Sequence, residues 1–448
     1  MNPPLKLAEW LTAPRPADTP IAWLADQCWS LGHLRHDVAE LIPYLQQQNG
    51  ARWALCFDNS YLFIVALLAT LHAGKTPVLP GHSRTALLNE QHTLFDDVLS
   101  DDALPWQGPG ITVRSARTTA ESRCVPALRP DATIELYTSG STGTPKRVIK
   151  TLAQLDAEAT LLATRFAERL SGCRMVGSVT HQHLYGLTFR IMLPMALGLP
   201  LHAGIIGFAE QLAALDHQHR YAFISSPAFL KRLDYRLTPP PISLIISAGG
   251  ELNDQLAAQV AKGLEIWPDE IYGSTETGVV AWRSHQQQNA AWQPFPGVEL
   301  RHESAGFRLF SPLIADDRGL SLDDSLHILA NGQFHLAGRR DRIVKIEEKR
   351  VSLSEVEQRL LTLKGVREAA ALPITRGGRQ SVGVVLVLDD SHRESWGKPQ
   401  ELAWRKALRV WLEPVAIPRY WRVVDEIPVN SMNKRVDAQL QELFDESR

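Results

Sequence analysis

The chain has 448 residues, a length that exceeds one ordinary hydrophobic core and predicts two or three domains. Its 47 Lys and Arg residues nearly balance 49 Asp and Glu residues, and the formal net charge of −2 excludes a general attraction to nucleic acid or to an anionic membrane. With 44% hydrophobic residues, the composition is that of a globular protein. Any anionic ligand must therefore be held by local geometry.

The cysteines and the apolar runs bear on where the protein resides. The N-terminal segment MNPPLKLAEWLTAPRPADTP lacks the apolar run of a signal peptide. The longest apolar stretch, at 61–71, is far shorter than the ~20 residues of a membrane helix, and it predicts a buried helix instead. Scattered cysteines without a CxxC pair argue against a disulfide scaffold or a zinc site. We expect a soluble, cytoplasmic protein without a membrane span; its cysteines are Cys28, Cys56, Cys124 and Cys173.

Short β-rich runs recur in the first three quarters of the chain, and helical patterns follow them. One predicted helix begins with Thr151 and Gln154 in a capping-box pattern, and apolar residues at steps of three or four follow. Strands that alternate with helices predict layered α/β sheets with much parallel pairing. In such sheets, ligands bind at the loops beyond the carboxyl ends of the strands. The predicted strands are 134–138, 147–150, 221–225 and 242–248.

The character of the sequence changes near residue 338. The stretch GRRDRIVKIEEKR is dense in charge, and helix, strand, helix and strand patterns follow it. This order predicts a small α+β domain of roughly a hundred residues, a size that folds independently. We therefore expect a large N-terminal domain at 1–337 and a small C-terminal domain at 338–448.

The loop at 137–147, YTSGSTGTPKR, combines hydroxyls, two glycines and two cations. It is not a Walker A loop, because Pro145 stands where that motif has glycine and Arg147 follows Lys146. Composition alone allows a flexible linker. However, a loop that closes over polyphosphate needs glycines, hydroxyl and backbone donors and a cation, and this stretch supplies them all.

The loop resembles the phosphate-loop signature of the adenylate-forming superfamily, which includes acyl-CoA synthetases, peptide-synthetase adenylation domains and luciferases. The resemblance runs from about residue 20 to residue 440. Within the superfamily, the sequence looks like a compact, standalone acyl or aryl acid ligase of a bacterial aryl-polyene or polyketide pathway. The other matching motifs follow in order: SAGGEL at 247–252, IYGSTETG at 271–278, GRRD at 338–341 and IPVNSMNKR at 427–435.

The resemblance implies a two-step reaction that uses ATP and Mg²⁺. A carboxylic acid is activated to an acyl-adenylate with release of pyrophosphate, and the acyl group then passes to the pantetheine thiol of coenzyme A or of an acyl carrier protein. The domain at 1–337 would bind ATP and the acid, and the domain at 338–448 would be a mobile lid. We expect an aromatic, hydroxybenzoate-like acid. The alternatives are a medium- or long-chain fatty acyl ligase, a luciferase-like oxidase, and a non-catalytic nucleotide-binding member that acts as an interaction protein.

The resemblance also implies catalytic roles for particular residues. Lys434 would bridge the attacking carboxylate and the α-phosphate. Glu276 would hold Mg²⁺ and Thr275 would donate to the α-phosphate, although both residue types also serve at a capped helix start. His183 falls at the acid pocket, where Tyr185 would add a polar aromatic side. A lone histidine is more often an ordinary core or surface residue, and His181 lies close by in sequence.

Other matched residues are expected to bind the nucleotide. Tyr272 would stack on the adenine, with core packing as the alternative. Asp324 would accept hydrogen bonds from the ribose, with Asp323 as its competitor, and Arg339 would lie near the ribose and phosphates. The remaining expected contacts are Thr138, Ser139, Gly140, Ser141, Thr142, Gly143, Lys146, Gly249, Gly250, Glu251 and Gly273.

The sequence departs from the family pattern at Arg147, Glu348 and Asn433, each of which stands where glycine is usual. A glutamate at 348 adds bulk and charge where the pantetheine arm would pass, and this makes adenylation the more secure half of the predicted reaction. A basic cluster near the hinge offers a surface for an acidic carrier protein, with a solvated hinge surface as the alternative. Its members are Arg339, Arg340, Arg342, Lys345, Lys349 and Arg350.

Overall fold

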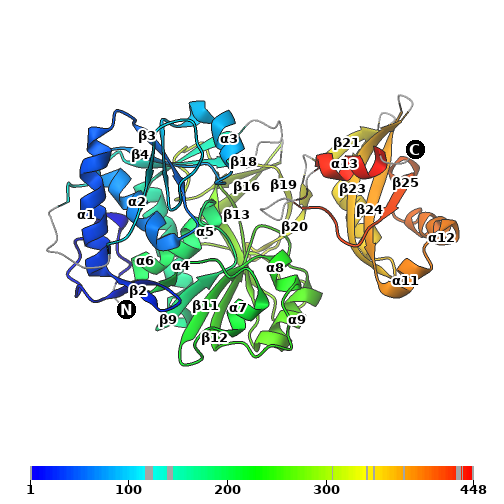
Figure 1. Ribbon diagram of the computed structural model, residues 1–448. Helices are drawn as coiled ribbons and strands as arrows, with labels where there is room; N and C mark the ends of the chain where they lie inside the picture. The colour runs from blue at the N-terminus through cyan, green and yellow to red at the C-terminus, as the bar shows by residue number, and fades with distance from the viewer. Residues whose placement is uncertain are drawn as a thin grey trace. The chain divides into compact units, whose positions relative to one another are not determined.

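The computed structural model divides into two compact units (Figure 1). The first comprises Met1–Glu299 and Phe310–Leu320, and the second comprises Leu300–Leu309 and Ser321–Arg448. The predicted hinge near residue 338 lies within the second unit, and the roles assigned to the two domains stay predictions. The structure describes residues 3–116, 125–138, 145–304, 306–339, 342–346, 349–376, 379–429, 435 and 437–445.

The larger sheet of the first unit has nine strands in the order β15-β14-β13-β12-β11-β9-β10-β1-β2. Strands β9 to β13 pair in parallel, which confirms the layered α/β prediction for this region. The predicted runs at 221–225 and 242–248 form β11 and β12. The bounds are β1 Pro20–Leu24, β2 Gln27–Ser30, β9 Cys173–Gly177, β10 Leu201–His202, β11 Arg220–Ser225, β12 Ile242–Ser247, β13 Asp269–Ser274, β14 Gly278–Ser284 and β15 Gln293–Pro294.

The second sheet of this unit has six strands in the order β6-β5-β3-β4-β7-β8. Its last two strands form an antiparallel hairpin, and the predicted phosphate loop connects them. The bounds are β3 Arg52–Cys56, β4 Thr76–Leu79, β5 Asp97–Ser100, β6 Gly110–Thr112, β7 Thr133–Thr138 and β8 Lys146–Thr151.

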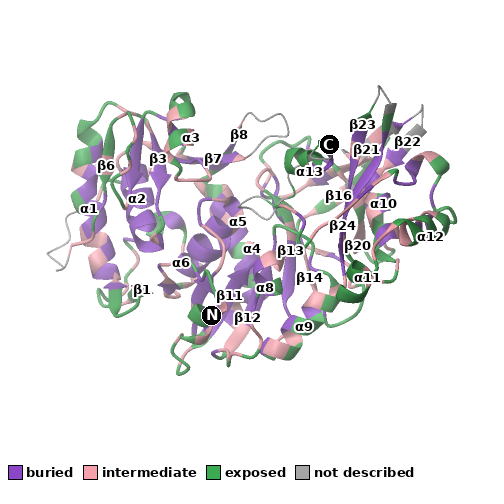
Figure 2. Cartoon of the chain, turned by 45° about the vertical axis from the view of Figure 1, so that its right-hand side comes forward, coloured by how far each residue is buried: buried purple, intermediate pink, exposed green. Residues whose placement is uncertain are grey.

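Helices pack on both faces of the nine-stranded sheet because successive strand residues point to opposite sides. Phe223 packs with the cluster that includes α7, α8 and α9, whereas its neighbours Ala222 and Ile224 pack with the cluster that includes α4. Figure 2 shows β11 largely buried between these layers. The helices of this unit are α1 Leu31–Gln47, α2 Ser60–His72, α3 Thr85–Glu90, α4 Leu152–Leu170, α5 Leu184–Gly186, α6 Leu193–Leu197, α7 Ala209–Ala213, α8 Pro227–Lys231 and α9 Asp254–Leu264, with a π-helix at Leu187–Met192.

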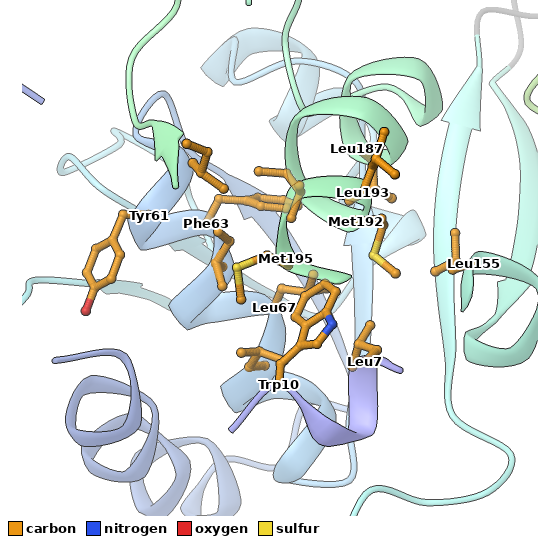
Figure 3. Close-up of a cluster of buried hydrophobic side chains, with 14 of the residues drawn as sticks. Leu7, Trp10, Tyr61, Phe63, Leu67, Leu155, Leu187, Met192, Leu193 and Met195 are labelled. Carbon is orange, nitrogen blue, oxygen red and sulfur yellow. The ribbon is translucent and has the colours of Figure 1, made fainter. Parts of the chain in front are cut away.

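The apolar run at 61–71 forms α2, every residue of which is buried as predicted. Phe63 and Leu67 of α2 face Trp10 and Met195 in the largest hydrophobic cluster (Figure 3). Among the helices that the structure describes, none combines the length and apolar character that a membrane crossing requires. Helix α4 begins with the predicted capping box, in which the Thr151 side chain accepts from the Gln154 backbone N–H.

The second unit has hydrophobic clusters of its own, built from residues between 344 and 444. Helix α10 packs on the strand pair β23–β24, and the predicted order of helix, strand, helix and strand is present as α10, β24, α12 and β25. The unit is α+β, as predicted. Its elements are β19 Asp324–Ile328, β20 Phe334–Arg339, β21 Ile343–Ile346, β22 Lys349–Ser352, β23 Val366–Arg376, β24 Arg379–Leu388, β25 Tyr420–Val423, α10 Leu353–Leu361, α11 Asp390–Glu394, α12 Lys398–Leu408 and α13 Asp437–Asp445. Strands β16 Glu299–Glu303, β17 Gly306–Phe310 and β18 Leu320–Leu322 form a further small sheet.

Candidate active site

The β7–β8 hairpin presents the two ends of the predicted phosphate loop. Thr138 ends β7 half-buried, and it pairs across the hairpin with Lys146, whose side chain is 60% exposed. The predicted loop contacts Ser139, Gly140, Ser141, Thr142 and Gly143 lie outside the described residues.

Arg147, the departure that follows Lys146, has an ion-pair partner in the structure. Its Nη1 lies 3.7 Å from Oε1 of Glu135, and Nη2 of Arg52 lies 2.5 Å from the other carboxylate oxygen. Arg52 also donates to the Tyr137 hydroxyl at 2.8 Å. Two arginines therefore neutralise a buried glutamate at the base of the hairpin, and this gives Arg147 a structural partner.

The YGSTETG motif forms a tight turn between β13 and the antiparallel β14. The alternative that these residues start a helix is wrong, because the chain reverses at 275–277 and continues as a strand. Thr277 Oγ1 accepts from the Ser274 N–H at 3.0 Å, and Ser274 Oγ accepts from the Thr277 N–H at 3.2 Å. A Cβ on Gly273 would lie 2.3 Å from the Gly278 carbonyl oxygen, so this turn requires glycine there.

The structure brings the predicted phosphate loop and the YGSTETG turn together through one contact. Lys146 Nζ lies 2.7 Å from Oε1 of Glu276, 130 residues away in sequence. Burial raises the pKa of Glu276, but the hydrogen bond and charge of Lys146 outweigh it and hold the pKa below its usual value. The carboxylate is therefore ionised and 33% exposed, with Thr275 half-buried beside it. A half-exposed anionic oxygen donor of this kind fits a hard divalent cation such as Mg²⁺.

The predicted adenine turn follows β12. Gly249, Gly250 and Glu251 are exposed, and Gly249 adopts a φ of +87°. The turn is anchored where it ends, because the Leu252 N–H donates to the buried Glu270 carboxylate at 2.9 Å.

Tyr272 lies on β13, which is adjacent to β12 in the sheet. Its side chain is half-buried, and its ring centroid lies 5.7 Å from that of Trp292. Tyr272 is therefore not enclosed in the core and retains an accessible surface.

The two histidines of VTHQHLYGL have different environments. His181 is fully buried, contacts Ser60 Oγ at 3.0 Å, and has a pKa far below its usual value because of burial. It is a neutral core residue. His183 is half-buried and caps the start of α5, and a Cβ on Gly81 would lie 3.0 Å from its ring. Of the two, His183 has the accessible side chain that a pocket residue requires.

Tyr185 lies at the carboxyl ends of β11 and β12. Its hydroxyl donates toward the carbonyls of Ser225 at 2.9 Å and Ile246 at 3.0 Å. Burial raises the pKa of Tyr185 well above its usual value, so the hydroxyl keeps its proton. Because that proton is directed at backbone carbonyls, the phenolic oxygen retains its capacity to accept a hydrogen bond.

The second unit contains the remaining expected contacts that the structure describes. Asp324 lies opposite Arg339 in the backbone register of the antiparallel strands β19 and β20. Asp324 is half-buried, whereas Asp323 is exposed. Arg342 of the predicted basic cluster is bound to Glu357, with Nη2 3.0 Å from Oε1. Lys434, Glu348 and the side chain of Arg339 lie outside the described residues, as do the side chains of the other members of the basic cluster.

Two charged residues near Glu276 were not singled out from the sequence. Lys150 Nζ donates to the Glu276 carbonyl at 2.9 Å, and Glu158 accepts from the Val279 N–H at 2.7 Å. A pattern signal for Glu158 exists, because it lies on the apolar face of α4 beside Leu155 and Leu162. Among the described residues, no group of three or more His, Cys, Asp or Glu side chains is arranged to hold a metal ion.

Comparison with known proteins shows which enzymes the chain resembles. The family model for AMP-binding enzymes matches residues 83–305. The chain is 28% identical over 321 residues to a 4-coumarate–CoA ligase of Cereibacter sphaeroides, covering 69% of this chain and 72% of the relative. It is 22% identical over 377 residues to 4-hydroxybutyrate–CoA ligase 1 of Metallosphaera sedula, covering 71% of this chain and 63% of the relative.

Among solved structures, ATP-bound MatB from Rhodopseudomonas palustris shares the fold, with a TM-score of 0.82, 19% identity, and coverage of 98% of this chain and 99% of that chain. The α/β fold class and the predicted superfamily are thereby confirmed. Residues 83–305 of the chain therefore match an AMP-binding enzyme domain, and the relatives and structures that the chain resembles agree with the predicted resemblance to the adenylate-forming superfamily.

Proposed function

We propose that this protein is an AMP-forming acid–thiol ligase. It joins a carboxylic acid to ATP as an acyl-adenylate, releases pyrophosphate, and transfers the acyl group to a pantetheine thiol. The observation that carries the proposal is the 2.7 Å contact between Lys146 and Glu276, because it joins two motifs whose residues are both predicted to bind phosphates or their Mg²⁺. A non-catalytic member would have no need to retain both charges in contact.

The proposed chemistry is a displacement at phosphorus. A carboxylate oxygen forms a bond to the α-phosphorus, the bond from that phosphorus to the bridging oxygen breaks, and its electron pair leaves with pyrophosphate. Lys146 would leave Glu276 and donate to phosphate oxygens, and Thr275 would donate to the α-phosphate. Mg²⁺, when bound to Glu276, supplies neutralising charge to the phosphates. Lys434 is proposed to bring the carboxylate and the α-phosphate together.

The proposed acid is aromatic and hydroxylated. Tyr185 and His183 would line the acid pocket, and the Tyr185 oxygen, whose proton is directed at backbone carbonyls, would accept a hydrogen bond from a substrate hydroxyl. The name of the 4-coumarate–CoA ligase relative supports an aryl acid, whereas the 4-hydroxybutyrate relative keeps an aliphatic acid as the competing class. The names of both relatives favour coenzyme A as the thiol, with an acyl carrier protein as the alternative.

Acid-dependent exchange of labelled pyrophosphate into ATP tests the first step. The panel pairs 4-hydroxybenzoate and 4-coumarate with benzoate and cinnamate, which lack the hydroxyl, and adds fatty acids of graded length and 4-hydroxybutyrate. We expect exchange with the hydroxylated aryl acids and weaker exchange without the hydroxyl. Tyr185→Phe is the matched variant, because it removes the accepting oxygen and keeps the ring.

Three outcomes of the panel would contradict parts of the proposal. Preference for fatty acids or for 4-hydroxybutyrate would refute the aryl acid, and no exchange in a protein that binds ATP would refute the ligase itself. The second step is then tested by mass spectrometry of the product with coenzyme A or with a phosphopantetheinylated carrier protein. Oxygen consumption that depends on acid and ATP, with no thioester, would indicate oxidation instead.

A further inference from the structure

Lys150 and Glu158 are oppositely charged residues in the interior of the first unit, close enough for their charges to attract each other. Both side chains are 3% exposed. Burial lowers the pKa of Lys150, and burial raises the pKa of Glu158, while the attraction between the two opposes each shift. A buried pair of this kind is weak evidence for added stability, because the cost of desolvating the charges offsets their attraction.

The hydrogen bonds of this pair converge on the turn that carries Glu276. Lys150 Nζ donates to the Glu276 carbonyl at 2.9 Å, and Glu158 Oε1 accepts from the Val279 N–H at 2.7 Å. The pair therefore binds the backbone at two points, one within the turn and one just after it. Gly278 lies between them with a φ of +69°, and a Cβ there would lie 2.8 Å from Glu158 Oε1, so the close approach of the carboxylate requires glycine.

Glu158 also reaches the region of the proposed acid pocket. Its second oxygen accepts from the Thr188 hydroxyl at 2.9 Å. Thr188 lies in the π-helix Leu187–Met192, which directly follows the helix that contains Tyr185. Irregular helical turns of this type are frequent at functional sites. One buried carboxylate thus connects the Glu276 turn to the segment that positions Tyr185.

We propose that Lys150 and Glu158 are positioning residues that hold the backbone of the 274–278 turn so that the Glu276 carboxylate faces Mg²⁺ bound to the nucleotide. This rests on the proposed function, since it takes Glu276 as the metal-binding carboxylate. Outer groups that orient a metal ligand commonly change metal affinity by about 10- to 100-fold when they are removed. The pair acts through the turn and does not itself contact the substrate.

The test compares Lys150→Met, Glu158→Gln and the double variant Lys150→Met/Glu158→Gln with the wild type. Two quantities are measured: the midpoint of urea unfolding, and the Mg²⁺ concentration that gives half-maximal ATP binding by calorimetry. We expect the singles to lower the unfolding midpoint and to raise the Mg²⁺ midpoint about tenfold. The double variant, which leaves no unpaired charge, should recover much of the stability but keep the raised Mg²⁺ midpoint.

Arg169→Met is the matched control, because it breaks the partly buried ion pair between helix α4 and Asp269. It should lower the unfolding midpoint and leave the Mg²⁺ midpoint unchanged. A Mg²⁺ midpoint that returns to the wild-type value together with stability in the double variant would make the pair merely structural. ATP binding that needs no Mg²⁺ in the wild type would also overturn the inference. The absence of pyrophosphate exchange with any acid would count against the proposed function alone, since the binding assay needs no turnover.

Discussion

Strand β8 presents two lysines to the same residue, and their surroundings give them different tasks. Lys146 is exposed and binds the Glu276 carboxylate, whereas Lys150 is buried and binds the Glu276 backbone carbonyl. The exposed contact is held in water, where an ion pair is worth ~0–1 kcal/mol, so phosphate groups can replace it. The buried contact is exchanged only if the fold opens. Burial thus distinguishes the Lys146 contact, which a ligand can replace, from the Lys150 contact, which holds the backbone of the turn.

The largest effect is expected from breaking the buried contact. Lys150→Met leaves the Glu158 charge unpaired, and removing one partner of a buried pair typically costs ~3–5 kcal/mol. Without the lysine, the pKa of Glu158, which burial already raises, rises further. A raised folded-state pKa stabilises the fold below the unfolded pKa, and that contribution is lost as pH rises through the folded value. The deficit relative to wild type should therefore be smaller at ~pH 5 than at ~pH 8 in urea unfolding. A deficit that is the same at both pH values would contradict the buried pair.

Glu276→Gln tests the exposed contact, which Lys146 makes with the Glu276 carboxylate. It keeps the shape of the residue and removes the charge, so we expect pyrophosphate exchange to fall by about 10²- to 10³-fold. The melting temperature should change little, because the carboxylate is partly exposed. Glu168→Gln, an exposed position on α4, is the matched control. Equal activity of the two variants would remove Glu276 from the proposed site.

Lys146→Ala should have a smaller effect, mainly on ATP use. The nucleotide loses one cationic contact, and we expect the KM for ATP to rise about tenfold, which corresponds to ~1.4 kcal/mol. Lys146→Arg, which keeps the charge, should lie between the wild type and the alanine variant. Unchanged kinetics in Lys146→Ala would indicate that the loop at 137–147 is a flexible linker and does not bind phosphate.

The smallest effect is expected at Arg147. Its guanidinium lies 3.7 Å from the Glu135 carboxylate and is half-exposed. When Arg147 is removed, Arg52 remains bound to the same carboxylate. Arg147→Ala should therefore cost less than ~1 kcal/mol in urea unfolding. It should leave pyrophosphate exchange near the wild-type value. A large loss of exchange would assign Arg147 to the nucleotide instead of to the hairpin.

Local patterns predicted the elements well. The capping residues of α4, Thr151 and Gln154, and the unbroken apolar run of α2 depend on neighbours three or four positions away, and both predictions are confirmed. The segment Ser274 to Glu276 was ambiguous, because the same residue types cap helices and form turns. The pairing of β13 with β14 resolved it as a turn.

By itself, the sequence determined the α/β class and the resemblance to the superfamily, and it predicted the residues of the candidate site, because motif residues and helical or strand periods are local properties. Only the tertiary structure decided that Lys146 contacts the Glu276 carboxylate and that the buried Lys150 donates to the Glu276 carbonyl. It also decided that Glu158 accepts from the Val279 N–H just after the turn. The physical reason is distance along the chain. Burial and charge partners depend on segments more than a hundred residues apart, and no local pattern records which of two lysines on one strand will face water.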